Sequence, residues 1–308
     1  MNIALATCSA LPALHDDDAP LVAALLERGM RAEAAVWDDP DVGWAAYDLV
    51  VIRSTWDYAQ RRTEFVEWCR RVDGVSALAN SWRTVRWNSD KHYLRDLESV
   101  GAPIVPTMWL EPERHFSSRA LHTRFPASGE FVIKPAISAG SIDTGRYTAM
   151  DADSRGLAIT HARRLLAAGR TVMVQRYLTS VDVIGERAHV FIAGDYSHSV
   201  LKGAMLDGPD VGIDGVYREE RMSPLEASER EVEFSTRVIA AARRILTRSV
   251  DGVDAVPDPF LYARVDVVTD DEGAPVLMEL ELVEPSLFTA LADGALDRFA
   301  DAIAARAS

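Results

Sequence analysis

Two strand-like segments near the end of the chain, joined by a short acidic turn, constrain its fold more than any other feature. They cover residues 261–268 and 275–283, and the turn contains the sequence DDEG at 270–273. A short connection that contains glycine is typical of a β-hairpin, so the segments are predicted to pair as antiparallel strands. Because side chains alternate along a strand, each segment turns every second residue toward the same face.

One face of the predicted hairpin carries four charged side chains. Alternation places Arg264 and Asp266 together on the first strand, and Glu279 and Glu281 together on the second, within reach across the pair. The other face of the second strand is expected to hold its apolar residues, namely Val276, Met278, Leu280 and Leu282.

The charged face has two interpretations. One is a solvated surface, since charged side chains are usually exposed. Neighbouring carboxylates repel one another, however, unless a cation lies between them, and Mg²⁺ prefers carboxylate oxygens. We therefore predict a metal site formed by Asp266, Glu279 and Glu281. Arg264 beside them is suited to stabilise negative charge that develops in a reaction, which makes it a candidate catalytic residue.

The first part of the chain alternates between strand-like and helix-like segments. The strand-like runs cover residues 2–7, 34–37 and 48–52, and the helix-like stretches cover 19–28 and 62–71. This alternation predicts an α/β domain over residues 1–86, with a small parallel sheet and helices packed on it.

The remaining residues, 87–308, are predicted to form an α+β region, because several strand-like segments follow one another without helices between them. Besides the C-terminal hairpin, strands are expected at 131–134, 172–175, 188–192 and 197–202. Helices are expected at about 89–100, 153–168, 224–248 and 287–305. At 308 residues the chain has the length of roughly two domains.

Composition and charge argue against several classes of protein. The chain has 33 basic and 47 acidic residues, which gives a net charge of −14. Because such a surface repels a phosphate backbone, no nucleic-acid partner is expected. No membrane partner is expected either, since no segment approaches the roughly 18 consecutive apolar residues of a membrane span. The two cysteines lack partners at metal-ligand spacing and favour a reducing cytoplasm.

Lysine is scarce in this chain. Only Lys91, Lys134 and Lys202 are lysines among the 33 basic residues. Lys134 precedes a small-residue loop at 135–141 that contains Ser138, Gly140 and Ser141, and the N–H groups of such a loop can surround phosphate oxygens. Each lysine by itself fits an ordinary surface position, and the loop fits an ordinary turn. Together they predict a site for nucleotide phosphates, where a compact cation is needed.

In their order along the chain these features resemble the ATP-grasp superfamily of carboxylate–amine ligases. The resemblance rests on Asp90–Lys91, Val132–Pro135 with its loop, Gln175–Leu178, Gly185–Arg187, Lys202, Ala263–Asp266 and Met278–Glu281. It implies an ATP-grasp fold from about residue 88 onward, preceded by a small α/β domain. A central lid subdomain would cover about 126–180, and a C-terminal metal subdomain about 181–308.

The resemblance implies that ATP and Mg²⁺ are the cofactors, and it assigns nucleotide-binding roles. Lys91 and Lys134 would contact phosphates, with Lys134 also near the adenine. Gln175 and Tyr177 would form the hinge whose backbone binds adenine, and Glu186 would hold the ribose. The superfamily usually has glutamate at the position of Gln175, so this chain departs from the pattern there.

The same resemblance assigns the reacting end of the site. Lys202 would meet the γ-phosphate, Arg264 would stabilise the transition state, and Asp266, Glu279 and Glu281 would bind Mg²⁺. Asparagine is usual at the position of Glu281, which makes this metal site more negative than is typical.

Four further segments are similar to the D-cycloserine synthetase type, the O-ureido-serine cyclo-ligases. They are Trp37–Pro40, Ile52–Tyr58, Ser138–Thr144 and Glu279–Phe288. This similarity implies an ATP-dependent carbon–nitrogen ligase of antibiotic biosynthesis that activates a carboxylate as an acyl phosphate. An internal nitrogen would then close the ring and convert O-ureido-D-serine to D-cycloserine. Two alternatives remain open, a ligase that joins two separate molecules and a nucleotide-binding module without catalysis.

The substrate is expected to be a small, amino-acid-like molecule. Ligands of parallel sheets bind beyond the carboxyl ends of the strands, so Arg53, Ser54 and Thr55 after the strand at 48–52 are predicted substrate contacts. Arg53 is suited to pair with a carboxylate, and Ser286 is a second candidate for holding it. The alternative is that the loop after this strand only packs at the domain boundary. The sequence leaves open whether the chain is a monomer or a homo-oligomer.

Overall fold

A four-stranded parallel sheet forms the N-terminal part of the computed structural model, which describes residues 1–206, 208–210, 221–247 and 260–308. Its strands are β1 (Asn2–Thr7), β2 (Arg31–Val36), β3 (Leu49–Ile52) and β4 (Ala77–Ala79), in the order β2-β1-β3-β4. The helices α1 (Pro20–Glu27) and α2 (Arg62–Asp73) and the 3₁₀ turns η1 (Trp44–Ala46) and η2 (Trp56–Gln60) connect these strands. The predicted parallel sheet is confirmed.

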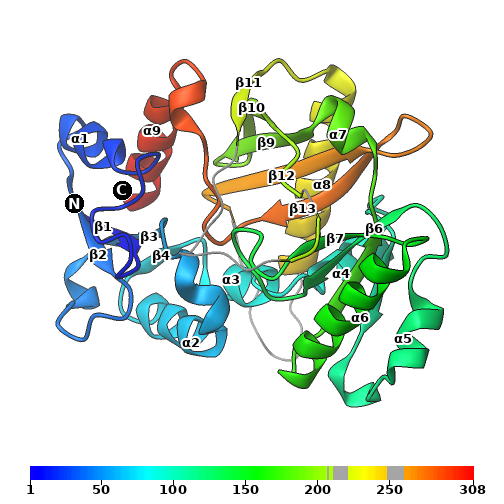
Figure 1. The fold of residues 1–308 in the computed structure, drawn as a ribbon. Helices are drawn as coiled ribbons and strands as arrows, with labels where there is room; N and C mark the ends of the chain where they lie inside the picture. Colours follow the sequence, from blue (N-terminus) through cyan, green and yellow to red (C-terminus); the bar gives the residue numbers. More distant parts are fainter. Residues whose placement is uncertain (207, 211–220, 248–259) are drawn as a thin grey trace.

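Two antiparallel sheets follow (Figure 1). The four-stranded one has the order β5-β8-β6-β7, formed by β5 (Thr107–Leu110), β8 (Val172–Arg176), β6 (Glu130–Pro135) and β7 (Gly145–Thr148). The five-stranded one has the order β11-β10-β9-β12-β13, formed by β11 (Met222–Leu225), β10 (Asp195–Lys202), β9 (Glu186–Ile192), β12 (Tyr262–Thr269) and β13 (Pro275–Glu281). The predicted α+β character of the later part is therefore confirmed.

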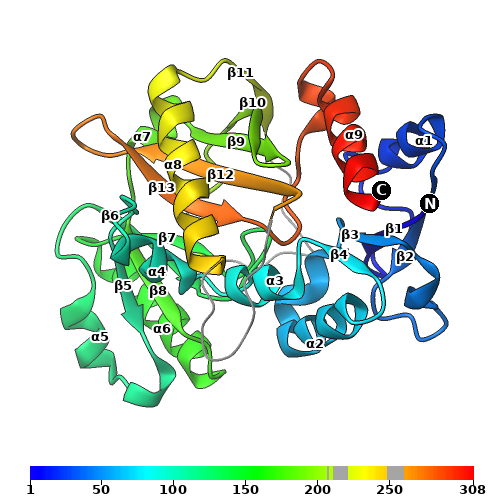
Figure 2. The same cartoon turned by 180° about the vertical axis from the view of Figure 1, so that it is seen from behind.

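Helices cover these sheets and join them. They are α3 (Trp82–Asn88), α4 (Tyr93–Ser99), α5 (Ser118–Arg124), α6 (Ala152–Ala167), α7 (Ser180–Ile184), α8 (Glu229–Leu246) and α9 (Ala295–Ala307), with 3₁₀ turns η3 (Pro112–Arg114) and η4 (Thr289–Leu291). α8 crosses one face of the five-stranded sheet (Figure 2). Its Phe234 and Val238 share a core with Val265 and Leu280 of the C-terminal hairpin, so the opposite face of the hairpin is left for the charged side chains.

The last helix lies beside the first one. α9 packs against α1 and the parallel sheet, as the adjacent red and blue ribbons show (Figure 1). Phe299 and Ile303 of α9 share a core with Leu5 and Leu21, and the same core reaches Tyr262 of β12. The two ends of the chain therefore stabilise one another. The domain boundary at residue 87 remains a prediction from the sequence. Among the described helices, none combines the length and apolar character needed to cross a bilayer.

Three predicted helices differ from the structure at their ends. The helix expected at 89–100 begins only at Tyr93, because residues 89–92 form turns and the N–H of Lys91 donates to the carbonyl of Ala136 instead of to a helical partner. The long helix begins at Glu229, not 224, since Ser228 forms a capping box with Glu231; its expected end at Arg248 lies outside the described residues. The last helix begins at Ala295, after Gly294.

A β-bulge corrects the predicted face of β13. The register shifts between Asp266 and Val267, so that Asp266 pairs with Glu279 but Val267 pairs with Leu277. One extra residue, Met278, is thereby inserted into β13. Met278 lines the central cavity instead of joining Leu280 on the apolar face, and Leu277 enters the core in its place.

Asn80 joins the parallel sheet to the C-terminal hairpin. Its amide nitrogen donates to the carbonyls of Tyr262 (2.9 Å) and Leu282 (2.8 Å), and its oxygen accepts the N–H of Leu261 (2.7 Å). We expect Asn80→Ala to lower the free energy of unfolding by about 3 kcal/mol, because it leaves buried backbone groups without partners. Urea unfolding measures this loss. Asn2→Ala, at an exposed position, is the matched control, and an equal effect of both substitutions would contradict the assignment.

Candidate functional site

A cavity of about 460 Å³ lies where the three sheets meet. Val132 and Lys134 of β6 line it from the four-stranded sheet, and Glu279 of β13 from the five-stranded sheet. Trp56 and Tyr58, which follow β3, line it from the N-terminal part. The cavity therefore draws on regions that are more than 200 residues apart in the chain.

The charged face of the hairpin borders this cavity. Arg264 lies directly opposite Glu281, and Asp266 opposite Glu279. The guanidinium of Arg264 donates from Nε to Oδ1 of Asp266 and from Nη2 to its Oδ2, both at 2.8 Å, and Nη2 lies 2.5 Å from Oε1 of Glu281. The predicted convergence of these side chains is present in the structure. Asp266 is buried behind the other three, which line the cavity.

Two of the three lysines neutralise these carboxylates. Lys91 Nζ lies 2.9 Å from Oε1 of Glu279 and donates to the carbonyl of Ser138 at 2.8 Å, so it also holds the small-residue loop. Lys202 Nζ lies 2.7 Å from Oε1 of Glu186 and 3.3 Å from Oδ2 of Asp266. The distant motifs are thus joined by ion pairs around one cavity.

Lys134 differs from the other two lysines. It is 9% exposed and lines the cavity, but its ammonium makes no ion pair or hydrogen bond with a described residue. Burial lowers the pKa of Lys134, and the nearby Glu279 opposes that shift. A buried ammonium without an anionic partner is suited to receive an anion from a ligand.

The carboxylates at the cavity wall fit a divalent cation. Burial raises the pKa of Glu281 to about 7; the ion pair with Arg264 opposes this shift, and the negative charges of Asp266 and Glu279 add to it. Excess negative charge at an oxygen-rich wall is what Mg²⁺ relieves. Glu279 and Glu281 therefore fit as ligands, whereas Asp266 is already held by Arg264 and Lys202.

A second acidic cluster lies outside the cavity, among the residues that the structure describes. Asp143, His161 and Asp210 place ligand atoms within 4.8 Å of one another. Arg164 Nη2, however, lies 2.7 Å from a carboxylate oxygen of Asp143 and 2.9 Å from one of Asp210. This arginine already supplies the positive charge that a metal would bring.

The small-residue loop and the hinge also border the cavity. Ser138, Gly140, Ser141, Gln175 and Tyr177 all line it. Gly140 and Ser141 both have positive φ, at 59° and 57°, which shows a tight local turn. The loop and hinge residues predicted to bind the nucleotide therefore border the same cavity as the three lysines.

One hinge prediction is corrected for the backbone N–H of Tyr177. The N–H of Tyr177 is donated to the carbonyl of Glu130 at 2.9 Å, so it is not available to an adenine ring. Its hydroxyl is bonded to Asp182, and Arg146 stacks on its ring 3.6 Å from the centroid. Tyr177 holds the hinge in place, while the next residue, Leu178, also lines the cavity.

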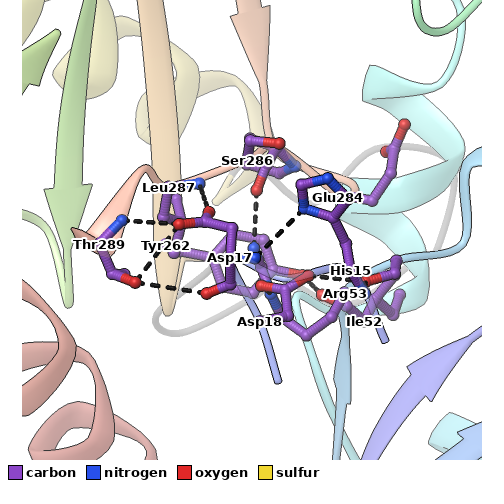
Figure 3. Close-up of polar contacts among 12 residues, drawn as sticks. His15, Asp17, Asp18, Ile52, Arg53, Tyr262, Glu284, Ser286, Leu287 and Thr289 are labelled. Carbon is purple, nitrogen blue, oxygen red and sulfur yellow. Dashed lines mark hydrogen bonds and ion pairs between the residues drawn. The ribbon is translucent and has the colours of Figure 1, made fainter. Parts of the chain in front are cut away.

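The predicted substrate contacts after β3 are also corrected. Arg53 is 1% exposed and, like Ser54 and Thr55, does not line the cavity. Its Nε lies 2.8 Å from Oδ1 of Asp18, and its Nη2 donates to the carbonyl of Pro285 at 2.7 Å (Figure 3). Because Asp18 takes the place expected for a substrate carboxylate, the alternative interpretation of this loop as a packing element holds for these three residues.

This buried pair is part of a larger connection between the chain ends. Ser54 donates to Asp18 at 2.8 Å. The carboxylate of Asp17 accepts the N–H groups of Leu287, Phe288 and Thr289 at 2.8–2.9 Å (Figure 3). The N-terminal loop thus fixes the segment after β13, which includes the cavity residue Ser286.

Several cavity residues, among them His15 and Glu284, were not singled out from the sequence. His15 reaches the wall from the loop after β1, where its ring lies 4.8 Å from that of Trp56. Glu284 lies three residues beyond Glu281 and also borders the cavity. No periodic pattern marks either position, because both lie in irregular segments.

Comparisons with known proteins agree with this arrangement. A family model described as "D-cycloserine synthetase DcsG, N-terminal domain" matches residues 3–80. The cycloserine biosynthesis protein DcsG of Streptomyces lavendulae is 37% identical over 307 residues, covering 99% of this chain and 98% of that protein. The crystal structure of D-cycloserine synthetase DcsG superposes with a TM-score of 0.86 at 34% identity, covering 100% of both chains.

More distant structures share the fold alone. D-alanine–D-alanine ligase from Bacillus anthracis, solved in complex with ATP, has a TM-score of 0.66 at 14% identity, covering 100% of this chain and 97% of that one. The ATP-grasp ligase PsnB, solved with a precursor variant, Mg and ADP, has a TM-score of 0.60 at 16% identity, covering 99% and 98%. The ATP-grasp fold implied by the motifs is confirmed by these superpositions.

Proposed function

This chain belongs to the D-cycloserine synthetase family of ATP-grasp ligases, and from that premise we propose that it cyclises O-ureido-D-serine to D-cycloserine. An ATP-dependent ligase activity follows from the family itself. The specific substrate rests on similarity along 99% of the chain, including the cavity-forming segments. The substrate carboxylate would be phosphorylated, and the internal nitrogen would attack the acyl carbon as phosphate leaves.

One observation carries this proposal. A single cavity is bordered by Lys91, Lys134 and Lys202 together with Glu279 and Glu281. Three ammonium groups and two carboxylates around one cavity provide for the phosphates of a nucleotide triphosphate and for the cation that accompanies it. A binding module would not need so complete a set of charged groups.

Each group has a proposed part in the reaction. Lys91, Lys134 and Lys202 would bind phosphate oxygens and offset their charge. Glu279 and Glu281 would hold Mg²⁺. Asp266 would join them as a ligand once it is released from its ion pairs. When bound, Mg²⁺ would offset negative charge on the phosphates.

Arg264 and Ser286 stand next to the proposed substrate position. Arg264 Nη1 donates to the carbonyl of Ser286 at 3.2 Å, so the two residues are held together. Arg264 would stabilise the oxyanion that forms when nitrogen attacks the acyl phosphate. Ser286 would hydrogen-bond the substrate carboxylate. Gln175, with Ser138, Gly140 and Ser141 of the loop, would enclose the nucleotide, and Glu186 would hold its ribose.

The activity is tested by incubating the protein with ATP, Mg²⁺ and O-ureido-D-serine. We expect substrate-dependent ADP release and a cyclic product identified by mass spectrometry. ADP release with a panel of amino acids and amines, giving joined amides, would instead favour a ligase of two molecules. Nucleotide binding without turnover of any carboxylate would favour a non-catalytic module.

The pKa of Glu281 predicts a pH-dependent requirement for Mg²⁺. Because this pKa is raised to about 7, the carboxyl is largely protonated below pH 7 and must lose its proton to bind a cation. The Mg²⁺ concentration for half-maximal ADP release should therefore fall by about fivefold from pH 6 to pH 7. Glu281→Gln is the control, since ATP itself also titrates. An identical pH profile in this variant would contradict the prediction.

A further inference from the structure

Glu284 is a buried carboxylate that faces the cavity and has no partner in the described part of the chain. It lies in the bend after β13, is 8% exposed and lines the cavity. Its carboxylate forms no ion pair or hydrogen bond with any residue that the structure describes; its backbone carbonyl alone is bonded, by Nε1 of Trp56 at 3.1 Å. In Figure 3 its side chain turns away from the hydrogen-bonded group around Asp17 and Arg53.

The other described carboxylates of the cavity wall all have cationic partners. Glu186 has Lys202 at 2.7 Å, Glu279 has Lys91 at 2.9 Å and Glu281 has Arg264 at 2.5 Å. Glu284 is the exception among these four. A buried carboxylate is costly unless it is paired, so this position is built for a cation that a ligand brings.

The electrostatics of the site support this reading. Burial raises the pKa of Glu284 well above its ordinary value, and the negative charge of Glu281 adds to the shift. Lys91 and Arg264 oppose it, but each is already paired with another carboxylate. An arriving cation would remove the penalty and hold Glu284 in its charged form.

The surroundings favour an organic ammonium over a second metal ion. Trp56, Tyr58 and His15, all from the N-terminal part, form the aromatic side of the cavity. Aromatic faces attract ammonium groups, whereas Mg²⁺ retains water and requires several oxygen ligands. The Trp56 hydrogen bond to the Glu284 carbonyl fixes the backbone of this residue against that aromatic side.

We infer that Glu284 binds the α-ammonium group of the amino-acid substrate. This inference rests on the proposed function and specifies it further. An ammonium held as a cation has no lone pair with which to attack an acyl phosphate. Glu284 would thereby leave the internal nitrogen as the nucleophile and direct the enzyme toward ring closure instead of joining through the α-amine.

The test pairs a variant with a substrate analogue. Glu284→Gln keeps the size of the side chain and removes its charge, and the analogue of O-ureido-D-serine without the amino group removes the ammonium. Binding of both compounds is measured by calorimetry on protein loaded with a non-hydrolysable ATP analogue. We expect wild type to prefer the amino compound by on the order of 100-fold, and Glu284→Gln to lose that preference. An unchanged preference in Glu284→Gln would overturn the inference.

Two controls separate this outcome from others. The affinity for the ATP analogue and the melting temperature should be the same in Glu284→Gln and wild type, and Glu284→Asp should retain part of the preference. A change confined to the Mg²⁺ requirement would assign Glu284 to the metal and overturn the inference. Turnover is measured separately: binding with the expected preference but no ADP release would count against the proposed function alone.

Discussion

Replacing Glu279 by glutamine is expected to abolish substrate-dependent ADP release, with kcat/KM reduced by about 10³-fold or more. Glu279 lies opposite Asp266 on the paired strand, forms an ion pair with Lys91 and borders the cavity. The substitution removes a proposed Mg²⁺ ligand and also leaves Lys91 without its carboxylate. Both losses weaken the neutralisation of charge on the transferring phosphoryl group.

The measurement is ADP release as a function of Mg²⁺ concentration, together with thermal unfolding to show that the fold is intact. Glu233→Gln is the matched control, since Glu233 is an exposed glutamate of α8 that pairs with Arg237 on the same helix. An undiminished rate with normal Mg²⁺ dependence in Glu279→Gln would refute the metal assignment.

Asp18→Asn is expected to cause the largest loss of stability, about 4 kcal/mol. Arg53 is fully buried, and Asp18 supplies the carboxylate next to its guanidinium. Removing the negative charge leaves a buried cation uncompensated. Because typical domains are stable by only 5–15 kcal/mol, a change of this size lowers the urea midpoint markedly.

A double variant distinguishes the cost of an unpaired buried charge from the cost of disturbed side-chain packing. Asp18→Leu combined with Arg53→Met removes both charges, so its loss of stability should be smaller than the sum of the two single losses. The exposed Arg237–Glu233 pair gives the reference, since Glu233→Gln should cost less than about 0.5 kcal/mol. Additive losses in the double variant would show that Asp18 and Arg53 do not depend on one another.

The sequence by itself was sufficient for the features that depend on local periodicity. Alternation along two short segments placed Arg264, Asp266, Glu279 and Glu281 on one face, and the structure pairs them across β12 and β13. The strand–helix alternation of the first part likewise predicted the parallel sheet. Such patterns can be read directly because the direction of a side chain on a regular element follows from its position.

Local irregularities were beyond the reach of those patterns. The bulge at Met278 shifts one residue of β13 into the cavity, and an ideal alternation cannot show where a register changes. The start of α8 was predicted too early because a capping box, not the apolar periodicity, decides where the first turn begins.

Only the tertiary structure decided which polar residues face the cavity. Arg53 follows a buried strand at a position where substrates often bind, but Asp18 and the carbonyl of Pro285, 35 and 232 residues away, enclose it. Among the described residues, no such partner contacts the carboxylate of Glu284, and the role that we propose for it rests on that difference. Burial and pairing are properties of segments brought together by folding, so they cannot be assigned to a residue from its neighbours in the chain.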